Sequence, residues 1–327
     1  MTNTVLITGS MGYLGGRIAA KLAEQSKLEL RLGTHKSKTN LPEWLKTGRF
    51  IPLDMTSEAD IVSACQGVQS IIHLAALNER DSKTNPEQAL VVSGLGTLKL
   101  VKAAQTAGVK KIIYFSTVHV YGSPLVGKIT EQTIPRPSSP YAITHRIAED
   151  IVLTAHDSKV LCGIVVRLSN AIGSPMHHEI NQWNLVVNDF CYQAVTNKKI
   201  VLKSSGLQMK DFITIEDITR AVLHFLDLSP SNCDNGLFNL GGENPMRIID
   251  MAEFISDRCS KVFGFKPEVV RPKPKQDETS EALSYSIDKL KSTGFSLERN
   301  IDQEIDATLR FCLNTFGNKT TSSISTE

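Results

Sequence analysis

The stretch near the N-terminus, residues 5–16, constrains the fold more than any other part of the sequence. It reads VLITGSMGYLGG, in which an apolar run typical of a strand leads into glycines at positions 9, 12 and 15. Residues 17–23 follow with helical periodicity. A strand, a tight glycine turn and a helix N-terminus form an anion site, because free backbone N–H groups and the positive end of the helix dipole face a pyrophosphate. The stretch therefore predicts a nucleotide-binding turn, with an ordinary structural turn as the alternative.

Further strand-type segments follow this turn and alternate with helical ones. The apolar segments lie at residues 28–32, 50–54, 71–76 and 112–116. A long helical segment, residues 86–107, separates the last two and is followed by Gly108, a common residue at helix ends. This alternation predicts a parallel, doubly wound α/β sheet of the Rossmann type, in which ligands bind beyond the carboxyl ends of the strands. The residues at those ends are Gly9, Asp54, Ala75, Ala76, Ser116 and Thr117.

The composition argues against several classes of function. The 327 residues are 41% hydrophobic, enough to bury a substantial core in one large domain or two smaller ones. Lys and Arg number 36 against 34 Asp and Glu, so neither the net charge of +2 nor any basic run indicates nucleic-acid binding. The chain enters a strand almost at once, and no apolar run reaches membrane-spanning length. Six scattered cysteines without a CxxC motif favour reduced thiols, so we expect a cytoplasmic protein.

The segment after the second strand bears on the choice of dinucleotide. In a dinucleotide-binding fold an acidic residue here accepts a hydrogen bond from the adenosine ribose, but residues 31–41 contain none. His35, Lys36 and Ser37 stand there instead, followed by Lys38. These donors suit a 2′-phosphate, which a carboxylate would repel. We therefore expect NADP, with NAD as the alternative; a solvated basic turn would also account for these residues.

Several motifs, in order along the chain, resemble those of the extended short-chain dehydrogenase/reductase family. Its members are NAD(P)-dependent sugar-nucleotide epimerases, dehydratases and reductases. The matching segments are TGSMGYLG at 8–15, HLAA at 73–76, FSTVHVYG at 115–122, SPY at 139–141, RLSNAIG at 167–173, KDFITIED at 210–217 and FNLGG at 238–242. The likeness covers nearly the whole chain at the spacing of the family, which makes it far more specific than any single motif.

The resemblance implies a hydride-transfer site built on Tyr141. In such a site a phenolate exchanges a proton with the substrate oxygen while the nicotinamide moves the hydride, and the hydroxyl of Thr117 shares that oxygen. His119, Asn170 and Lys210 are the implied substrate contacts. The residues implied to bind the dinucleotide are Gly9, Met11, Gly12, Tyr13, Leu14, His35, Lys36, Ser37, Asp54, Met55, Leu74, Ala75, Ala76, Ser116, Tyr141 and His145.

The chain departs from the family one helical turn after Tyr141. An unperturbed tyrosine is a poor base at pH 7, and a cation four residues along the helix normally lowers its pKa. The family has Lys there, whereas this chain has His145. We expect a shorter, partly protonated imidazole that takes a catalytic role imperfectly, giving a pH-sensitive enzyme, or weakens the proton relay. Alternatively, His145 merely packs under the cofactor. Arg146 points away on the helix and is a poor substitute.

Other positions also depart from the family pattern. Ser93 replaces a family Asn that assists the helix geometry or the water relay. Lys210 replaces an Arg that grips a diphosphate, so weaker diphosphate binding is expected. Val118 and His119 replace the Asp-Glu pair of the 4,6-dehydratases, so dehydration by that mechanism is not expected. His119 is either an acid–base group or a structural residue.

These features predict how the chain is divided. We expect a Rossmann domain from residues 1–170 and 211–242, a smaller C-terminal substrate-binding subdomain from 171–210 and 243–316, and a disordered tail at 317–327. Within the substrate half, residues 183–195 predict an amphipathic helix. The adjacent His177 and His178 lack the spacing of helical metal ligands, so no metal site is expected.

The resemblance implies an NAD(P)-dependent oxidoreductase or epimerase that acts on the carbonyl or hydroxyl of a nucleotide-linked sugar or a similar polar substrate. The alternative is a catalytically weakened NADP(H)-binding sensor or scaffold, suggested by the replacements at 93, 145 and 210. Because family members often dimerise through helices near residues 89–107 and 141–154, a homodimer is expected. Neither a nucleic acid nor a membrane is expected as a partner.

Overall fold

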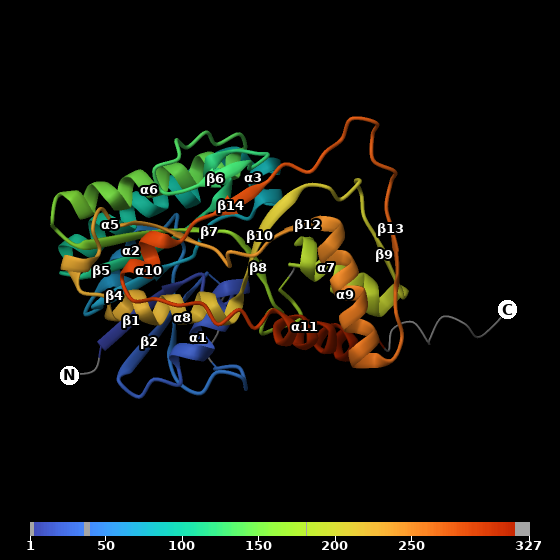
Figure 1. The fold of residues 1–327 in the computed structure, drawn as a ribbon. Coiled ribbons are helices and arrows are strands. Elements are labelled where there is room, and N and C mark those ends of the chain that lie inside the picture. The colour runs from blue at the N-terminus through green and yellow to red at the C-terminus, as the bar shows by residue number, and fades with distance from the viewer. Residues whose placement is uncertain (1–2, 36–39, 181, 318–327) are drawn as a thin grey trace.

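The structure is a computed structural model that describes residues 3–35, 40–180 and 182–317 (Figure 1). Its centre is a seven-stranded parallel sheet in the order β11-β7-β5-β4-β1-β2-β3. The strands are β1 (Asn3–Thr8), β2 (Leu28–Thr34), β3 (Arg49–Pro52), β4 (Ser70–His73), β5 (Lys111–Thr117), β7 (Cys162–Leu168) and β11 (Leu237–Leu240). The chain winds outward from β1 to β3, then crosses back to β4 and winds the other way. The predicted doubly wound α/β fold is confirmed.

Helices cover both faces of this sheet (Figure 1). On one face lie α1 (Tyr13–Leu22), α8 (Ile215–Asp227) and α10 (Asp288–Ser292), and on the other α2 (Glu58–Cys65), α5 (Gly96–Thr106) and α6 (Pro140–Asp157). Side chains in a strand alternate between faces, so Val5 and Ile7 of β1 join the first core while Leu6 joins the second. The central strands β1, β4, β5 and β7 are mostly apolar because both of their faces are buried, whereas β2 and β3, toward one edge of the sheet, carry exposed charged residues such as Glu29 and Arg49.

A smaller group of elements lies beyond the carboxyl ends of the sheet and has its own apolar core (Figure 1). Its helices are α7 (Val186–Asn197), α9 (Ile248–Phe263) and α11 (Ile301–Phe316). Three small sheets accompany them: β12-β10-β8 (Pro245–Arg247, Met209–Thr214, Asn170–Ile172), β13-β9 (Glu268–Val270, Lys199–Val201) and β14-β6 (Leu283–Tyr285, Gly127–Ile129). The sequence predicted a smaller C-terminal subdomain, and this group of elements corresponds to it. The residue boundaries given for the two domains stay a prediction.

The long helix predicted for residues 86–107 is divided in the structure. It consists of α4 (Pro86–Ala89), a π-helical turn η1 (Leu90–Leu95) and α5, with α3 (Glu79–Thr84) before it. A Cβ on Gly96 would lie 2.9 Å from the carbonyl oxygen of Met55, so the start of α5 packs closely on the loop after β3. Apolar spacing over so short a stretch does not distinguish a π-turn from regular helix, so the sequence did not predict it.

Two helix boundaries bear on the sequence predictions. α7 begins at Val186 and not at Trp183, because the backbone of Leu185 is extended, with a ψ of 135°. The Trp183 ring, before the helix, packs against the rings of Tyr192, Phe311 and Phe316. Gly317, the first residue of the predicted tail, caps α11 by donating its N–H to the carbonyl oxygen of Leu313, and the boundary of the tail stays a prediction. The rest of the predicted tail, residues 318–327, lies outside the described residues.

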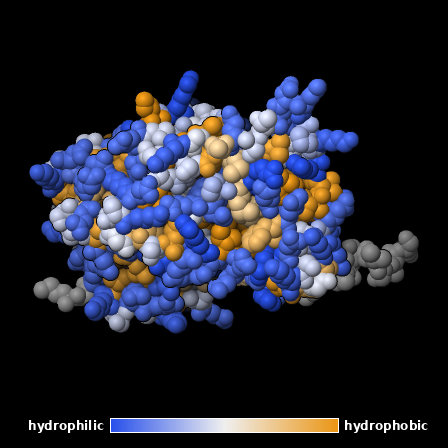
Figure 2. Space-filling view, in the orientation of Figure 1, coloured by the Kyte–Doolittle hydropathy of each residue, from blue (hydrophilic) through white to orange (hydrophobic). Residues whose placement is uncertain are grey.

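The remaining elements are two short 3-10 turns, η2 (Val118–Tyr121) and η3 (Pro230–Asn232). Hydrophilic side chains cover most of the face seen in Figure 2, with apolar residues scattered between them. Within the described part of the chain, none of the helices combines the length and the apolar character needed to cross a bilayer.

Candidate active site

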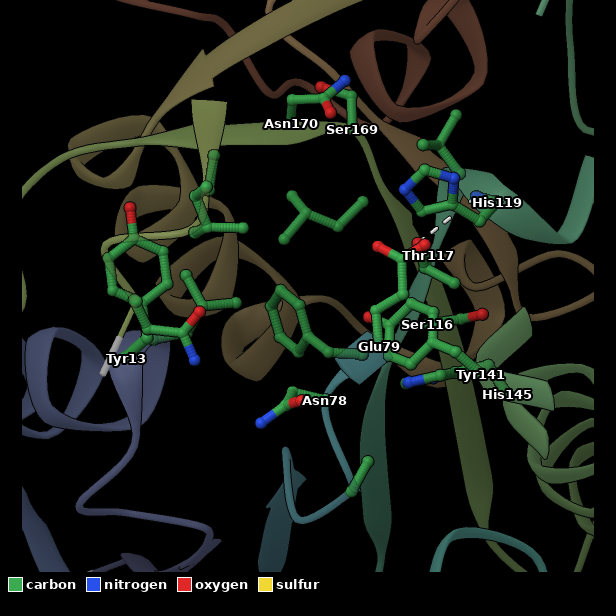
Figure 3. A pocket seen from close by; sticks show the side chains of 18 of the residues that line it. Tyr13, Asn78, Glu79, Ser116, Thr117, His119, Tyr141, His145, Ser169 and Asn170 are labelled. Atoms are coloured by element: carbon green, nitrogen blue, oxygen red, sulfur yellow. Dashed lines mark hydrogen bonds between the residues drawn. The ribbon is translucent and has the colours of Figure 1, made fainter. Parts of the chain in front are cut away.

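A cleft of about 660 Å³ opens beyond the carboxyl ends of β1, β4, β5 and β7, where the smaller group of elements faces the sheet (Figure 3). One end holds the glycine turn after β1, and the other holds the start of α6. The sequence-predicted residues that line it are Gly9, Gly12, Tyr13, Leu14, Leu74, Ala76, Ser116, Thr117, His119, Tyr141, His145, Asn170 and Lys210. The fold thus gathers side chains from positions 9 to 210 around one space.

Other predicted dinucleotide residues lie outside this lining. Met11, His35, Asp54, Met55 and Ala75 do not line the cleft. Met55 is buried against Gly96, whereas Asp54 is exposed and accepts hydrogen bonds from Thr56. Their predicted role in binding the dinucleotide stays a prediction. Lys36 and Ser37 fall outside the described residues.

The glycine turn has no room for side chains. Gly9 has a φ of +65°, and a Cβ there would lie 3.1 Å from the backbone nitrogen of Ala75 at the end of β4. A Cβ on Gly15 would lie 2.2 Å from the carbonyl oxygen of Gly9. Gly12, the N-cap of α1, provides no side chain to bond the first N–H groups of that helix. The backbone at the start of α1 therefore faces the cleft closely and with unused donors, which suits a dinucleotide's phosphates.

Tyr13 takes part in this turn through its position more than through its hydroxyl. Its side chain is buried, and the hydroxyl donates to the carbonyl oxygen of Gly173 at 2.7 Å. Burial raises the pKa of this phenol well above its ordinary value. The hydroxyl thus links α1 to the segment after β8, and the side chain lines the cleft beside the glycine turn (Figure 3).

Tyr141 and Thr117 meet at the opposite end of the cleft (Figure 3). Ser139 caps α6 by accepting a hydrogen bond from the Ala142 N–H at 3.3 Å, and Pro140 opens the helix, so Tyr141 lies in its first turn. Thr117 ends β5, and its hydroxyl accepts from the His119 N–H at 3.2 Å. Burial raises the pKa of Tyr141 to about 12, and a hydrogen bond with Thr117 opposes part of that rise.

His145 is buried next to Tyr141. Its ring stands edge-on to the Tyr141 ring with 4.5 Å between centroids, and its Nδ1 lies 2.6 Å from the Tyr114 hydroxyl. Burial lowers the pKa of His145 to about 4, and the charge of His119 acts in the same direction. The imidazole is therefore neutral at pH 7, and the expectation of partial protonation is wrong, because the sequence could not show how completely this position is buried.

Arg146 cannot supply the missing cation. Its guanidinium pairs with Asp150 at 2.5 Å and lies 3.3 Å from a Glu149 oxygen. Glu149 itself is fully buried and receives two hydrogen bonds from Arg167, at 2.9 and 2.7 Å. Ser116 also donates to Glu149, at 2.5 Å, so its hydroxyl holds the end of β5 in place. The prediction that Arg146 points away from Tyr141 agrees with these contacts.

A second buried histidine, His73, lies at the end of β4 and connects neighbouring elements beneath the cleft. Its two ring nitrogens lie 2.7 Å from the Thr8 hydroxyl and 2.9 Å from the Thr97 hydroxyl. Thr97 donates in turn to the carbonyl oxygen of Ser93 in η1. Burial lowers the pKa of His73 to about 3. The neutral His73 ring therefore links β1, β4 and α5. Ser93 contacts this network through its carbonyl oxygen, and its hydroxyl accepts from the N–H of Leu77, which lines the cleft, at 3.4 Å.

Sequence reasoning missed two kinds of residue. Asn78 and Glu79 line the cleft directly after β4, and Glu79 lies close enough to raise the pKa of Tyr141 (Figure 3). Following the chain for three residues beyond the HLAA segment would have suggested them. Tyr114 was missed because it lies inside β5, where an aromatic residue reads as core. Its contact with His145 has no signal in a single sequence.

His119 and Lys210 share their end of the cleft with Glu79. Burial lowers the pKa of His119, and the charge of Lys210 lowers it further, while Glu79 opposes both effects. Burial likewise lowers the pKa of Lys210 against the charge of Glu79. These groups can hold or exchange protons beside Tyr141, whose ring lies 6.3 Å from that of His119. Asn170 also lines the cleft, and its amide donates to the carbonyl oxygen of Asp211 at 2.9 Å.

The predicted absence of a metal site concerns His177 and His178. Their rings stack with 4.6 Å between centroids and lie outside the cleft lining. The described residues hold no group of three or more potential ligands that could hold a metal ion.

Comparison with known proteins places these features in context. A family model described as "NAD dependent epimerase/dehydratase family" matches residues 5–241. A putative UDP-glucose 4-epimerase of Methanocaldococcus jannaschii is 24% identical over 315 residues, which cover 95% of this chain and 98% of that protein.

Two solved structures share the fold. The UDP-glucuronic acid 4-epimerase from Bacillus cereus, in complex with UDP-glucuronic acid and NAD, matches with a TM-score of 0.77 at 20% identity, covering 95% of this chain and 99% of that one. RMD from Pseudomonas aeruginosa, complexed with NADPH, matches with a TM-score of 0.73 at 20% identity, covering 96% and 99%. At such identity the likeness concerns the fold alone.

Proposed function

Because this chain belongs to the NAD dependent epimerase/dehydratase family, we propose that it is an NAD(P)-dependent enzyme that epimerises a nucleotide-linked sugar. This is the extended short-chain dehydrogenase/reductase family that its motifs resemble. The observation that carries the proposal is the cleft itself, which joins a closely packed glycine turn to a Thr117–Tyr141 pair. Relatives described as UDP-sugar 4-epimerases support the choice of substrate class.

The glycine turn would hold the dinucleotide's phosphates. The close approach of Gly9 to β4, and of Gly15 to Gly9, leaves a backbone surface that fits a pyrophosphate and has no side chain in the way. The uncapped first turn of α1 supplies N–H donors and the positive end of its dipole. Leu74 and Ala76, after β4, give the cleft an apolar wall beside this turn.

At the other end, Tyr141 and Thr117 would hold the sugar oxygen. When bound, the nicotinamide supplies a hydride acceptor and donor, which is the chemistry that the chain's own side chains lack. The chain's task is to move the proton: Tyr141 accepts it from the sugar hydroxyl and later returns it, while the Thr117 hydroxyl orients that oxygen. Asn170 and Lys210 line the side of the cleft from which the sugar nucleotide would approach.

We propose NADP as the dinucleotide, with NAD as the alternative. Residues 31–41 contain no carboxylate to bind an adenosine ribose, and His35 is exposed at the end of β2. Proteins of this fold bind either dinucleotide, since one solved relative is complexed with NAD and another with NADPH. Calorimetry with both oxidised dinucleotides decides between them, and tighter binding of NAD would reject this assignment.

The test of function is product formation by the purified full chain. UDP-glucose, UDP-glucuronic acid and UDP-N-acetylglucosamine are each incubated with a catalytic amount of NADP or NAD, and the nucleotide sugars are separated by chromatography. We expect conversion of one of them to its 4-epimer, with no lasting change in nicotinamide absorbance, because the hydride returns to the same sugar. A lasting absorbance change would indicate an oxidoreductase instead, and no change in any sugar would contradict enzymatic function on this substrate class.

The second candidate is a dinucleotide sensor or scaffold with little catalysis. The observation in its favour concerns the residue one helical turn after Tyr141: burial lowers the pKa of His145 to about 4, so it is neutral, and burial raises the pKa of Tyr141 to about 12. Both would weaken proton transfer near neutral pH. Micromolar dinucleotide binding without turnover of any of the three sugars would favour this candidate.

We also propose a homodimer in the cytoplasm. Five apolar side chains on η1 and α6, which pack side by side, are 37–46% exposed: Leu90, Val91, Leu95, Ile143 and Ile147. An apolar face shared by two helices is typical of a subunit interface. All six cysteines are buried free thiols, which suits a reducing compartment. Light scattering should give twice the chain mass, and the Leu95→Glu variant should give the monomer mass.

A further inference from the structure

Tyr114 and His145 form a buried pair directly beneath the proton-transfer end of the cleft. Tyr114, in β5, is 1% exposed, and its hydroxyl lies 2.6 Å from Nδ1 of His145. The two rings are nearly parallel, with 5.8 Å between centroids and 30° between planes. His145 in turn stands edge-on to Tyr141 (Figure 3). The imidazole therefore connects a tyrosine of the core with the tyrosine of the cleft.

The direction of the Tyr114–His145 hydrogen bond follows from burial. A buried hydroxyl strongly favours an acceptor for its proton, and Nδ1 of His145 is the partner of this hydroxyl among the described residues. The ring is neutral, because burial lowers the pKa of His145 to about 4. A neutral imidazole carries one N–H, so with Nδ1 accepting, its proton is on Nε2.

The Tyr114–His145 hydrogen bond also determines where the Nε2–H group of His145 points. The two ring nitrogens point out of an imidazole in divergent directions, so Nε2 is turned away from Tyr114 while the ring lines the cleft. Among the described residues, the hydrogen bonds of His145 include no acceptor for Nε2. The chain thus presents one uncharged donor beside Tyr141, without a partner from the protein itself.

The groups around the pair keep it uncharged. His73 lies next to Tyr114, with 5.4 Å between ring centroids, and His119 faces His145 from η2; positive charge on either histidine would oppose protonation of His145. Two carboxylates lie in this region: Arg167 already holds both oxygens of Glu149, and Glu79 interacts with Lys210 and His119 across the cleft. An imidazolium at position 145 would therefore lack a free counter-charge.

We propose that Tyr114 is a positioning residue that fixes His145 as the neutral Nε2–H tautomer, so that a single uncharged donor replaces the family's lysine. The ligand it would serve is an oxygen acceptor, the ribose hydroxyl next to the nicotinamide. This step rests on the proposed function. Within it, His145 holds the dinucleotide but leaves Tyr141 without a neighbouring positive charge.

The first test reads the tautomer in the full chain without any ligand. Nitrogen NMR of isotope-labelled histidine distinguishes the two tautomers, and loss of a signal in His145→Gln assigns it. We expect the Nε2–H form in the wild type. In Tyr114→Phe, which removes the donor to Nδ1, the pKa of His145 should rise by roughly half a unit to one unit.

The matched control is Tyr285→Phe. It removes another buried hydroxyl, which bonds the Arg167 carbonyl oxygen at 2.8 Å and Asn239 at 3.0 Å. This variant loses a comparable internal hydrogen bond but should leave the His145 signal unchanged. A proton on Nδ1 in the wild type would overturn the proposal, and so would a Tyr114→Phe titration identical to that of the wild type.

The second test measures dinucleotide affinity by calorimetry in two backgrounds. In the wild type, Tyr114→Phe should weaken binding roughly two- to tenfold, because the donor is no longer fixed. In a His145→Lys background the same substitution should change affinity by less than about twofold, because the ammonium does not depend on Tyr114 for its donor. Equal losses in both backgrounds would overturn the proposal, since Tyr114 would then act only on stability.

The two tests separate this inference from the proposed function. If the tautomer is as proposed but no dinucleotide binds, the proposed function fails and the role for a ribose hydroxyl fails with it. If dinucleotide binds and sugars turn over while Nδ1 carries the proton, the function stands and the positioning role of Tyr114 is wrong.

Discussion

The two ends of the cleft are built from different parts of the chain's chemistry. At the glycine turn, backbone atoms form the surface proposed to bind the phosphates. This surface requires residues without side chains at Gly9 and Gly15. At the far end, the proposed proton transfer depends on the side chains of Thr117, Tyr141 and His145 and on how deeply each is buried. The first end keeps the family pattern, whereas the second departs from it at position 145.

We infer from this difference that phosphate binding and proton transfer are separable in this fold. A site made of backbone is set by the strand–turn–helix geometry and tolerates changes elsewhere. A site made of side chains changes its electrostatics with each substitution, because burial and neighbouring charges set each pKa. The following predictions test that separation, starting with the substitution that should have the largest effect on binding or activity.

The largest effect is expected from Gly15→Ala. Its Cβ would lie 2.2 Å from the Gly9 carbonyl oxygen, so the turn must open, and we expect no dinucleotide binding at millimolar concentration by calorimetry. Overpacking of this kind also lowers the free energy of unfolding by about 1–3 kcal/mol.

The control for this change is Gly16→Ala, one residue further along α1. Its Cβ would lie at ordinary contact distance, 3.4 Å, from Met176, so binding should be retained. If Gly15→Ala binds as well as Gly16→Ala, the glycine turn does not hold the phosphates.

The second-largest effect is expected at the proton-transfer end of the cleft, on catalysis and not on dinucleotide binding. Tyr141→Phe removes the group that exchanges the proton, and we expect kcat to fall by about 10²- to 10⁴-fold. Dinucleotide affinity should change by less than about threefold, because the backbone cradle is untouched. Steady-state kinetics and calorimetry on the same preparation measure both. A matching loss of affinity would show that the two ends are not separable.

The sequence predicted one end of the cleft much better than the other. The parallel sheet and the glycine turn follow from local patterns, so residues 5–16 were sufficient to predict the turn. The identity of Tyr141 and Thr117 came from motifs, but the neutral state of His145 depends on contacts across 31 residues of sequence with Tyr114. The π-turn η1 likewise has no signal in the periodicity, whereas Glu79 could have been found by following the chain beyond the HLAA segment.

Restoring the family residue sharpens the comparison. His145→Lys places an ammonium beside Tyr141, and a nearby positive charge lowers a tyrosine pKa by about one to three units. We expect kcat at pH 7 to rise by about tenfold and the rising, low-pH limb of the pH profile to move to lower pH, because Tyr141 acts as a base in its deprotonated form. The double variant Tyr141→Phe/His145→Lys should stay inactive. An unchanged rate and pH profile would exclude position 145 from the proton relay.

Part of the pH dependence of stability should come from two histidines buried beneath the cleft. Burial lowers the pKa of His145 to about 4 and of His73 to about 3, below their ordinary 6.5. Both rings are neutral in the folded chain but bind protons when unfolded, so their contribution is complete above pH 6.5 and is lost as pH falls toward 4 and 3. At pH 5.5 each should have lost about 1.4 kcal/mol of stability.

Denaturant unfolding between pH 8 and pH 5.5 measures this loss. His145→Gln should remove about half of the histidine-dependent decrease, whereas His178→Gln, at an exposed histidine, should remove none of it. An equal pH response in the wild type and in His145→Gln would mean that this ring is protonated or solvated in the folded chain.

The smallest effect concerns the adenosine end, where the glycine turn meets β2. His35→Asp introduces the carboxylate that residues 31–41 lack, and this charge should repel a 2′-phosphate while accepting a hydrogen bond from a ribose hydroxyl. We expect the ratio of NADP to NAD affinity, measured by calorimetry, to fall by about fivefold, or about 1 kcal/mol. Lys273→Asp, an exposed change in the loop between β13 and β14, should leave the ratio unchanged. With saturating dinucleotide, kcat should not change. A change in kcat caused by His35→Asp would show that the two ends of the cleft do not act independently.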